Sequence, residues 1–249
     1  MMAKDWNMTA KGFDPRPSNC VSYNNGNYTV TLSLADGTMI RYSKDDKLVP
    51  SFPDSMDIKI TNCCSLNCRY CHEKSTKNGQ HGDILSDSFI DKLHPYTQLA
   101  LGGGNVLEHP DFVPFLKKCK KLKLVPSVTV NQIHFMQQHK FLKQLTDEKL
   151  IYGLGISFHH PDKNFLPMLR SFPNAVIHTI AGVTKEKDYE FLYDKGLKIL
   201  ILGYKKFGRG IEAYQESHQH IDNTIMNLKH LLPYLVKENG SKKQVLKET

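Results

Sequence analysis

From residue 55 onward, short β-type runs and helical patterns alternate six times along the chain. The first run, Met56 to Thr61, has apolar residues at alternate positions, and the last, Leu197 to Leu202, precedes a helix with apolar residues every three or four positions. Strands joined through helices pair in parallel, because each crossover returns the chain to the same end of the sheet. The alternation predicts an α/β fold with a parallel sheet, either open and doubly wound or curled toward a barrel. The predicted strand and helix pairs are 56–61 with 86–93, 98–101 with 110–122, 128–131 with 133–145, 152–158 with 164–169, 175–182 with 186–193, and 197–202 with a helix that includes 221–235.

The first 54 residues follow a different pattern. Residues 1–22 contain prolines but no sustained periodicity, so we expect an irregular arm there. Alternating apolar residues over 28–34, a turn at Asp36-Gly37 and a return over 39–42 predict a β-hairpin. Residues 44–53 are charged and contain prolines, which is typical of a linker. The expected organisation is an N-terminal arm with a β-hairpin extension over 1–54, a main domain over 55–237 and a polar tail over 238–249.

Composition and charge exclude several classes of protein. The chain has 249 residues and a net charge of 33 − 25 = +8. Its longest apolar runs, such as Ile199 to Leu202, are too short to span a bilayer, and the polar start Met1 to Trp6 has no apolar signal core. We therefore expect a soluble, cytoplasmic protein with no membrane segment. The positive charge could favour nucleic acid or an anionic substrate, but lysine pairs such as Lys117-Lys118 are equally typical of a solvated helix face.

Four of the six cysteines crowd into nine residues directly after the first predicted strand: Cys63, Cys64, Cys68 and Cys71. Such crowding cannot connect distant segments, so it indicates metal ligation in a reducing compartment rather than a disulfide framework. Three thiolates from one loop can hold three irons of a cubane cluster and leave the fourth iron open to a ligand. A structural zinc site is the alternative. Candidates for its fourth ligand are Cys63, His72 and His81.

The spacing Cys64-x-x-x-Cys68-x-x-Cys71, with the aromatic Tyr70 just before the last cysteine, resembles the radical S-adenosylmethionine (SAM) superfamily. The resemblance covers roughly residues 55–237 and implies a partial (β/α)6 TIM-like barrel. It also implies that the three cysteines bind a [4Fe-4S] cluster whose open iron is chelated by SAM. Tyr70 would then lie near the adenine of SAM.

Other segments are similar to the SAM-binding segments of that family. Residues 102–105, Gly-Gly-Gly-Asn, resemble its Gly-Gly-Glu-Pro segment, which contacts the methionine amino group. Asn105 stands where the family has glutamate, so the amide oxygen would accept the hydrogen bond without charge assistance, and Glu108 is a possible substitute three residues later. At the fifth predicted strand, His178 replaces a glycine of a family segment, and we assign no site there. The SAM-binding residues that the resemblance implies are Tyr70, Gly102, Gly103, Gly104, Asn105, Asn131 and Ser157.

The resemblance implies an enzyme in which a reduced cluster passes an electron to SAM. The cleavage yields methionine and a 5′-deoxyadenosyl radical, which abstracts hydrogen from a substrate. An electron donor of the flavodoxin or ferredoxin type is implied. No sequence motif indicates the substrate or the oligomeric state. A short barrel with a broad opening slightly favours a peptide or protein segment, and a nucleotide or nucleic acid is the alternative.

Two interpretations of another class remain open. One is a zinc-stabilised nucleic-acid-binding module, and the other is a non-catalytic regulator that binds SAM without cleaving it. Further polar residues follow the fourth and sixth predicted strands, where two interpretations are open: they either line a functional site or lie in solvated surface loops. His159 and His160 could move protons or bind substrate, whereas Lys205, Lys206 and Arg209 could hold a phosphate or carboxylate of substrate or of SAM.

Overall fold

A computed structural model describes residues 19–86 and 88–237, with side chains described throughout except at 186 and 224–237. The chain divides into two compact units, Met1–Asp54 and Ser55–Thr249. The predicted tail over 238–249 and most of the predicted N-terminal arm lie outside the described residues.

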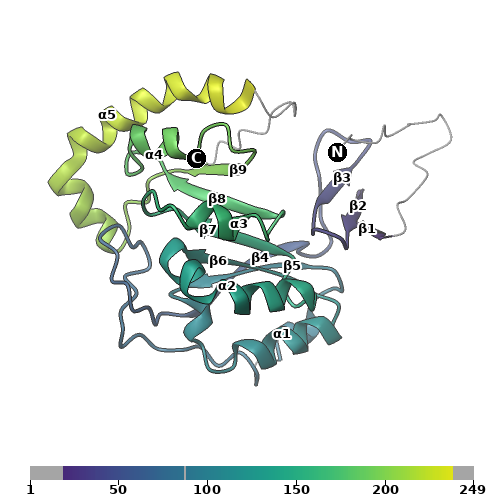
Figure 1. Cartoon of the computed structure of the whole chain (residues 1–249). Coiled ribbons are helices and arrows are strands. Elements are labelled where there is room, and N and C mark those ends of the chain that lie inside the picture. The colour runs from purple at the N-terminus through teal and green to yellow at the C-terminus, as the bar shows by residue number, and fades with distance from the viewer. Residues whose placement is uncertain (1–18, 87, 238–249) are drawn as a thin grey trace. The chain divides into compact units, whose positions relative to one another are not determined.

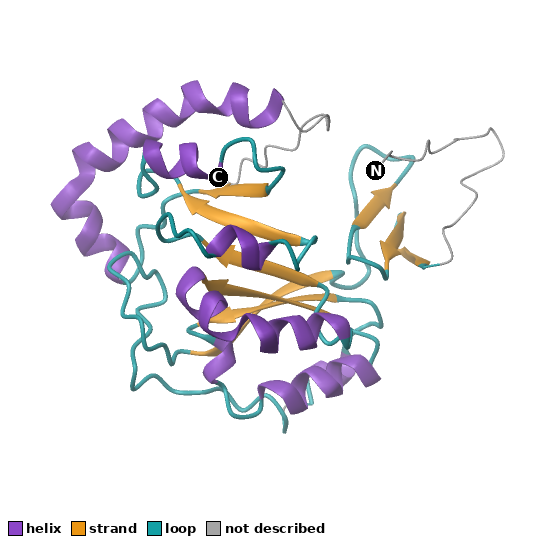
Figure 2. Ribbon diagram, in the orientation of Figure 1, coloured by secondary structure: helices purple, strands orange, loops and turns teal. Residues whose placement is uncertain are grey.

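The second unit is built on a parallel sheet of six strands, which lie side by side in chain order (Figures 1 and 2). Every strand except the last is followed by a crossover that returns the chain to the same end of the sheet, so neighbouring strands run parallel. The predicted parallel sheet is confirmed, and its topology is consistent with a partial barrel. The strands are β4 (Ser55–Thr61), β5 (Gln98–Gly103), β6 (Val125–Asn131), β7 (Gly153–Ser157), β8 (Ala175–Ile180) and β9 (Lys198–Leu202).

The five crossovers contain four α-helices and two 3₁₀ turns, and a fifth α-helix follows β9, among the described residues. They are η1 (Ile90–Lys92), η2 (Val106–Glu108), α1 (Phe112–Lys121), α2 (Gln132–Asp147), α3 (Phe165–Leu169), α4 (Glu186–Leu192) and α5 (Arg209–Lys237). The predicted helix over 86–93 is wrong, since of the described residues in that range only the 3₁₀ turn is helical. Ile90 is the only buried residue of this turn, so a longer helix would have too little apolar surface to repay its nucleation. None of the described helices is both long enough and apolar enough to cross a membrane.

The two faces of the six-stranded sheet differ in chemistry. On one face, residues such as Leu99, Val128 and Ile156 pack against Phe115 of α1 and Phe135 of α2 in a continuous apolar core. Full burial of one such side chain contributes about 1.5–3 kcal/mol. Helices α1, α2 and α3 lie along this face (Figure 1). The alternate positions of the same strands, on the opposite face, are mostly small or polar: Lys59, Ala100, Gly102, Ser127, Thr129, Gly153, Gly155, Ser157 and His178.

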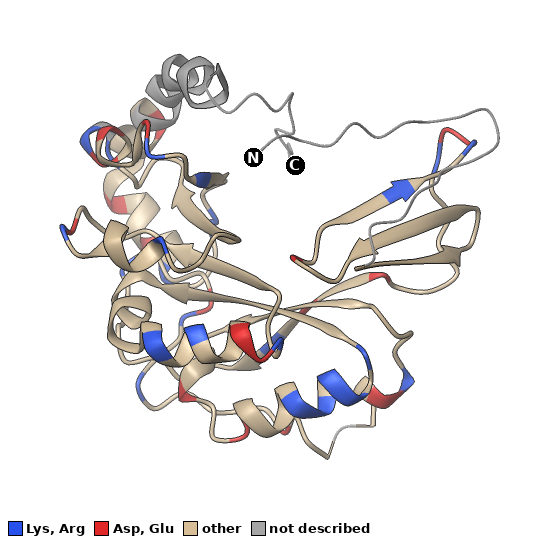
Figure 3. Ribbon diagram, turned by 45° about the vertical axis from the view of Figure 1, so that its right-hand side comes forward, with Lys and Arg blue, Asp and Glu red and all other residues tan. Residues whose placement is uncertain are grey.

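Lysines gather on the solvent side of α1, where Lys and Arg are drawn in blue (Figure 3). Lys117 and Lys121 are exposed, whereas Phe115 and Cys119 of the same helix are buried in the core. Lys118 forms an ion pair with Asp91 at 3.1 Å. This arrangement matches the solvated helix face that the lysine pairs suggested.

The first unit is an antiparallel sheet of three strands in the order β1 (Cys20–Asn25), β2 (Tyr28–Ser33) and β3 (Met39–Tyr42). The predicted hairpin is present as β2 and β3. The prediction of an irregular arm through residue 22 is wrong at its end, because Cys20 begins a strand that pairs with β2. The missed signal is the dipeptide Asn25-Gly26, where Gly26 has a φ of +61° in the turn between β1 and β2.

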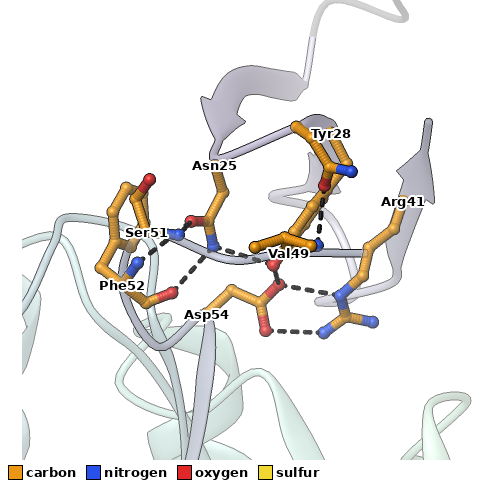
Figure 4. A network of polar contacts seen from close by, with 8 residues as sticks. Asn25, Tyr28, Arg41, Val49, Ser51, Phe52 and Asp54 are labelled. Atoms are coloured by element: carbon orange, nitrogen blue, oxygen red, sulfur yellow. Dashed lines mark hydrogen bonds and ion pairs between the residues drawn. The ribbon is translucent and has the colours of Figure 1, made fainter. Parts of the chain in front are cut away.

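The segment predicted as a linker is held against this small sheet by side chains (Figure 4). Asn25 is fully buried; its Oδ1 accepts hydrogen bonds from the amides of Ser51 and Phe52 at 2.8 and 3.2 Å, and its Nδ2 donates to the Phe52 carbonyl at 2.9 Å. Asp54 forms a two-bond ion pair with Arg41 at 2.8 and 2.9 Å. Because a buried amide is costly unless it is fully hydrogen-bonded, these contacts make the segment an ordered part of the unit.

Candidate functional site

Strand β4 leads at its carboxyl end into residues 62–82, the cysteine loop, which carries all four clustered cysteines. The two ends of the loop pair with each other: the Cys64 amide donates to the Thr76 carbonyl, and the Asn62 amide donates to the Gln80 carbonyl, both at 2.8 Å. Residues 65–75 between them form neither helix nor strand. The loop is therefore closed at its base and irregular where the cysteines lie.

The structure brings the three predicted ligands together on this loop. All are free thiols, and Cys64, Cys68 and Cys71 lie close enough to influence one another electrostatically. Burial raises the pKa of the Cys64 and Cys68 thiols, and the charge of Arg209 opposes that rise. Within residues 19–86 and 88–237, no three His, Cys, Asp or Glu side chains form a group that could hold a metal ion. The loop thus collects thiols without forming a compact ion site.

Glycines after β5 allow its end to approach the cysteine loop. The Asn105 amide donates to the Cys63 carbonyl at 2.7 Å, and a Cβ on Gly104 would clash with that same carbonyl. Gly103 has a φ of +110°, which side chains rarely adopt. A Cβ on Gly102 would meet nothing within 4 Å. Glycine is thus required at 103 and 104 for close approach, and at 102 the glycine borders open space.

Asn105 is engaged in the local structure. Its Oδ1 accepts the amide of Leu107 at 3.2 Å at the start of η2, and its Nδ2 donates to Glu108 Oε1 at 3.0 Å. Glu108 also accepts hydrogen bonds from Ser65 Oγ at 2.9 Å and from Cys63 Sγ at 3.3 Å. The structure therefore places the Glu108 carboxylate, and not a free Asn105 amide oxygen, beside the cysteine loop. The spacing of an asparagine cap followed three residues later by glutamate is the sequence signal that points to this pair.

The Glu108 carboxylate is kept ionised. Burial opposes its charge, but hydrogen bonds from Asn105 and Ser65 outweigh that effect and hold its pKa below the usual range. His134 of α2 lies with its Nε2 3.8 Å from Glu108 Oε1 and 3.3 Å from Ser65 Oγ. Burial lowers the pKa of His134, although Glu108 opposes the shift, so the imidazole is neutral at pH 7. A negative charge therefore stands at the carboxyl ends of β4 and β5. Sequence analysis missed His134, because nothing in an amphipathic helix marks the one histidine that faces a site.

Polar residues at the carboxyl ends of the next strands form one row. Asn131 of β6 pairs with Ser157 of β7, and Ser157 pairs with His178 of β8. Asn131 Oδ1 accepts the Ile133 amide at 2.9 Å and so caps α2. A Cβ on Gly155 would lie 2.5 Å from the His178 ring, so this glycine leaves room for the imidazole on the sheet face. Burial lowers the pKa of His178. The structure thus adds His178 to the predicted pair.

His159 and His160 are exposed on the loop after β7. Their backbone amides donate to Oε1 of the buried Gln132 at 2.8 and 3.1 Å, and Gln132 Nε2 donates back to the His160 carbonyl at 2.8 Å. The loop is therefore fastened to the start of α2 through its backbone, while the two rings contact each other edge to face at 5.1 Å.

The loop after β9 meets the cysteine loop. The Arg209 amide donates to the Cys71 carbonyl at 3.0 Å, and the Tyr204 ring lies edge-on to Tyr70 at 6.3 Å. Lys205 and Lys206 are exposed, and Lys206 Nζ lies 3.6 Å from the centre of the Tyr214 ring. The loops that follow the first and last strands of the sheet therefore contact each other at its carboxyl edge.

No protein-family model matches the chain, and a search of curated proteins finds no match. Among solved structures, Streptococcus suis SuiB bound to S-adenosylmethionine aligns with 86% of this chain and 70% of its own, at a TM-score of 0.53 and 10% identity. SuiB bound to the precursor peptide SuiA aligns with 88% of this chain and 69% of its own, with the same score and identity. The chain therefore has a fold similar to that of SuiB. At 10% identity the likeness shows the fold alone.

Proposed function

We propose that this chain is a radical SAM enzyme whose cysteine loop holds a [4Fe-4S] cluster through Cys64, Cys68 and Cys71. The observation that carries the proposal is the placement of three free thiols on one loop, at the carboxyl end of the first strand of a radical SAM-like fold. Active sites of parallel barrels lie at that end of the strands.

When bound, the cluster and SAM would supply reductive cleavage of SAM to methionine and a 5′-deoxyadenosyl radical that abstracts hydrogen from a substrate. The role of the protein is to bind, to orient and to exclude water. Burial of the Cys64 and Cys68 thiols opposes their ionisation, and Arg209 supplies a positive charge that favours the thiolate form needed for ligation.

We assign the ammonium group of SAM to Glu108. Asn105 uses its Oδ1 to cap η2, whereas Glu108 is ionised and lies next to the cysteine loop. A charged acceptor makes a hydrogen bond roughly twice as strong as a neutral one. Open space over Gly102, together with the glycines at 103 and 104, would let the backbone lie close to the methionine portion.

The remaining SAM contacts are proposed on the predicted residues. Tyr70 would flank the adenine, with Tyr204 behind it. Asn131 and Ser157 are neighbours in register at the ends of β6 and β7, where two hydroxyl groups of a ribose could be bound together. Because Asn131 Oδ1 caps α2, its Nδ2 group is the one left for the ligand.

The electron is proposed to come from a flavodoxin- or ferredoxin-type carrier. The exposed cations Lys205 and Lys206, on the loop bonded to Cys71 through Arg209, would attract an acidic partner toward the cysteine loop. For the substrate we favour a peptide or protein segment. Its support is the match to SuiB bound to the precursor peptide SuiA and the small, polar residues on the sheet face opposite the core.

The test is the iron, sulfide and zinc content of protein purified and reconstituted without oxygen. Dithionite and SAM are then added, and 5′-deoxyadenosine is measured by chromatography. We expect about four irons per chain and release of 5′-deoxyadenosine. Stoichiometric zinc without iron would overturn the proposal in favour of a zinc-stabilised module. A loaded cluster with tight SAM binding but no cleavage would instead identify a non-catalytic regulator.

A further inference from the structure

Arg209, the first residue of α5, binds three carbonyl groups of the cysteine loop. Its backbone amide donates to Cys71 at 3.0 Å, its Nε donates to Cys68 at 2.9 Å, and its Nη2 donates to Ser75 at 2.9 Å. The side-chain partners lie 141 and 134 residues earlier in the chain. One residue therefore fastens the loop after the last strand to the loop after the first.

The contact depends on Gly208 as well as on the guanidinium. Gly208 has a φ of +54°, and a Cβ there would lie 2.5 Å from the His72 carbonyl oxygen and 2.8 Å from that of Cys71. The backbone before Arg209 thus rests directly on the backbone of the cysteine loop. A glycine at this position is what lets the arginine reach its partners.

Near Cys71 the cysteine loop is held internally by long backbone hydrogen bonds. The Cys71 amide donates to the Cys68 carbonyl, and the Lys74 amide donates to the Cys71 carbonyl, each at a long 3.2 Å. The Ser75 residue is 1% exposed, so without the guanidinium its carbonyl would lose a donor where water has little access. An unpaired buried acceptor is costly, and the loop would rearrange to avoid it.

The guanidinium also acts through its charge. The Nε and the backbone amide of Arg209 donate to the carbonyls of Cys68 and Cys71, so the positive charge lies against the backbone of two of the proposed ligands. A cluster ligated by thiolates gains negative charge on reduction, and a fixed cation nearby stabilises the reduced form.

We propose that Arg209 is a positioning residue, which holds the cysteine loop in the shape that presents Cys68 and Cys71 and places a fixed positive charge beside the cluster. The charge effect rests on the proposed function, whereas the clamp on the loop does not. Two donors of the Arg209 guanidinium, on Nε and Nη2, are thus used to bind carbonyl groups of the cysteine loop.

The clamp is tested in metal-free protein by hydrogen–deuterium exchange of residues 66–76. We expect Arg209→Gln to accelerate exchange there about tenfold, while the core helices α1 and α2 keep their protection as a check on folding. Arg209→Lys should accelerate it too, because a single ammonium group cannot reproduce the planar fork of donors. The matched control is Arg69→Gln, since Arg69 lies in the same loop but pairs with Glu216 at an exposed surface. Exchange in Arg209→Gln equal to that in Arg69→Gln would overturn the clamp.

The charge effect is tested in reconstituted protein by iron content and by a redox titration followed by electron paramagnetic resonance. Arg209→Gln should hold less iron, and the clusters that remain should have a more negative midpoint potential. Arg209→Lys should lose iron but keep a potential near that of the wild type. Equal potentials in the wild type and Arg209→Gln would refute the charge effect. If the wild type binds no cluster, the proposed function has failed, and the exchange experiment still decides whether Arg209 holds the loop.

Discussion

Two irregular segments, residues 43–54 and the cysteine loop, are held in different ways. The first is fixed by side chains of its own small unit: Asn25 binds the backbone of Ser51 and Phe52, and Asn27 binds that of Val49. The second is fixed from the ends of other strands, through the backbone of Asn105 and through Arg209.

The two ways of holding a segment have different consequences, one for stability and the other for ligand binding. Buried amides that bind backbone near in sequence stabilise a unit too small to rely on its core alone. Bonds from distant strand ends fix a loop relative to the carboxyl edge of the sheet, where we propose that the chemistry takes place. Disturbing the first segment should therefore cost stability, and disturbing the second should cost ligand binding.

The largest effect is expected in the cysteine loop itself. Cys64→Ala, Cys68→Ala or Cys71→Ala should abolish the four-iron cluster and with it the cleavage of SAM, because one iron loses its protein ligand. Iron content and the absorbance of reconstituted protein measure this. Cys63→Ala is the matched control and should keep its iron, since Cys63 lies outside the triad and bonds to Glu108. Loss of metal in Cys63→Ala together with bound zinc would point to a four-cysteine site.

Asn25→Ala should produce the largest loss of stability in the first unit. The substitution removes the hydrogen bonds that Asn25 forms with two backbone amides and a carbonyl of residues 51–52, at an expected cost of about 2–4 kcal/mol. Hydrogen–deuterium exchange at residues 49–52 in the full-length protein measures it. Asn24→Ala is the control, because the side-chain hydrogen bond seen for Asn24 is an exposed one, donated by the Thr29 hydroxyl. Similar exchange in the two variants would show that the segment is not held by Asn25.

Glu108 and Asn105 can be separated by their effect on SAM affinity. Glu108→Gln should weaken binding about 10- to 100-fold, because the ammonium group loses a charged acceptor. Asn105→Asp should not tighten binding, since it sets a second carboxylate beside Glu108. Calorimetry with oxidised, cluster-loaded protein measures both without turnover. Tighter binding by Asn105→Asp with no change in Glu108→Gln would return the ammonium group to position 105.

The smallest effect is the acid sensitivity of the first unit. The hydrogen bond from Arg41 is the main cause that lowers the pKa of Asp54, and a bond from the Tyr28 hydroxyl adds to it. Since the folded pKa lies below the unfolded value of about 3.9, this stabilisation is present above that pH and is lost as pH falls through the folded pKa. We expect a small loss of stability, seen as lower protection factors at residues 49–52 below pH 4, where the protection factor compares the observed exchange with the intrinsic rate at the same pH. Asp54→Asn should be less stable at pH 7 and should lack this part of the acid dependence.

Sequence patterns predicted the elements whose side chains repeat along the chain. The six strands of the large sheet follow alternating or buried apolar runs, and α1 shows the expected apolar face of Phe115 and Cys119. The prediction of helices and strands failed where the apolar pattern was too short to distinguish one element from another. In the range 86–93 the single helical turn has one buried residue, Ile90, which is too little for an apolar pattern to predict. Strand β1 was not predicted, although the dipeptide Asn25-Gly26 is typical of the hairpin turn that follows it.

The sequence alone placed the thiols on one loop after a strand, because the spacing of cysteines is a local property. It also placed glycines and polar residues at strand ends, but not their partners. Only the tertiary structure decided that Asn105 caps a turn while Glu108 faces the cysteine loop, that His134 joins them, and that Arg209 binds the carbonyls of Cys68 and Ser75. These pairings depend on strand register and on glycines that let backbones touch, and residues more than a hundred positions apart leave no periodic trace of such contacts.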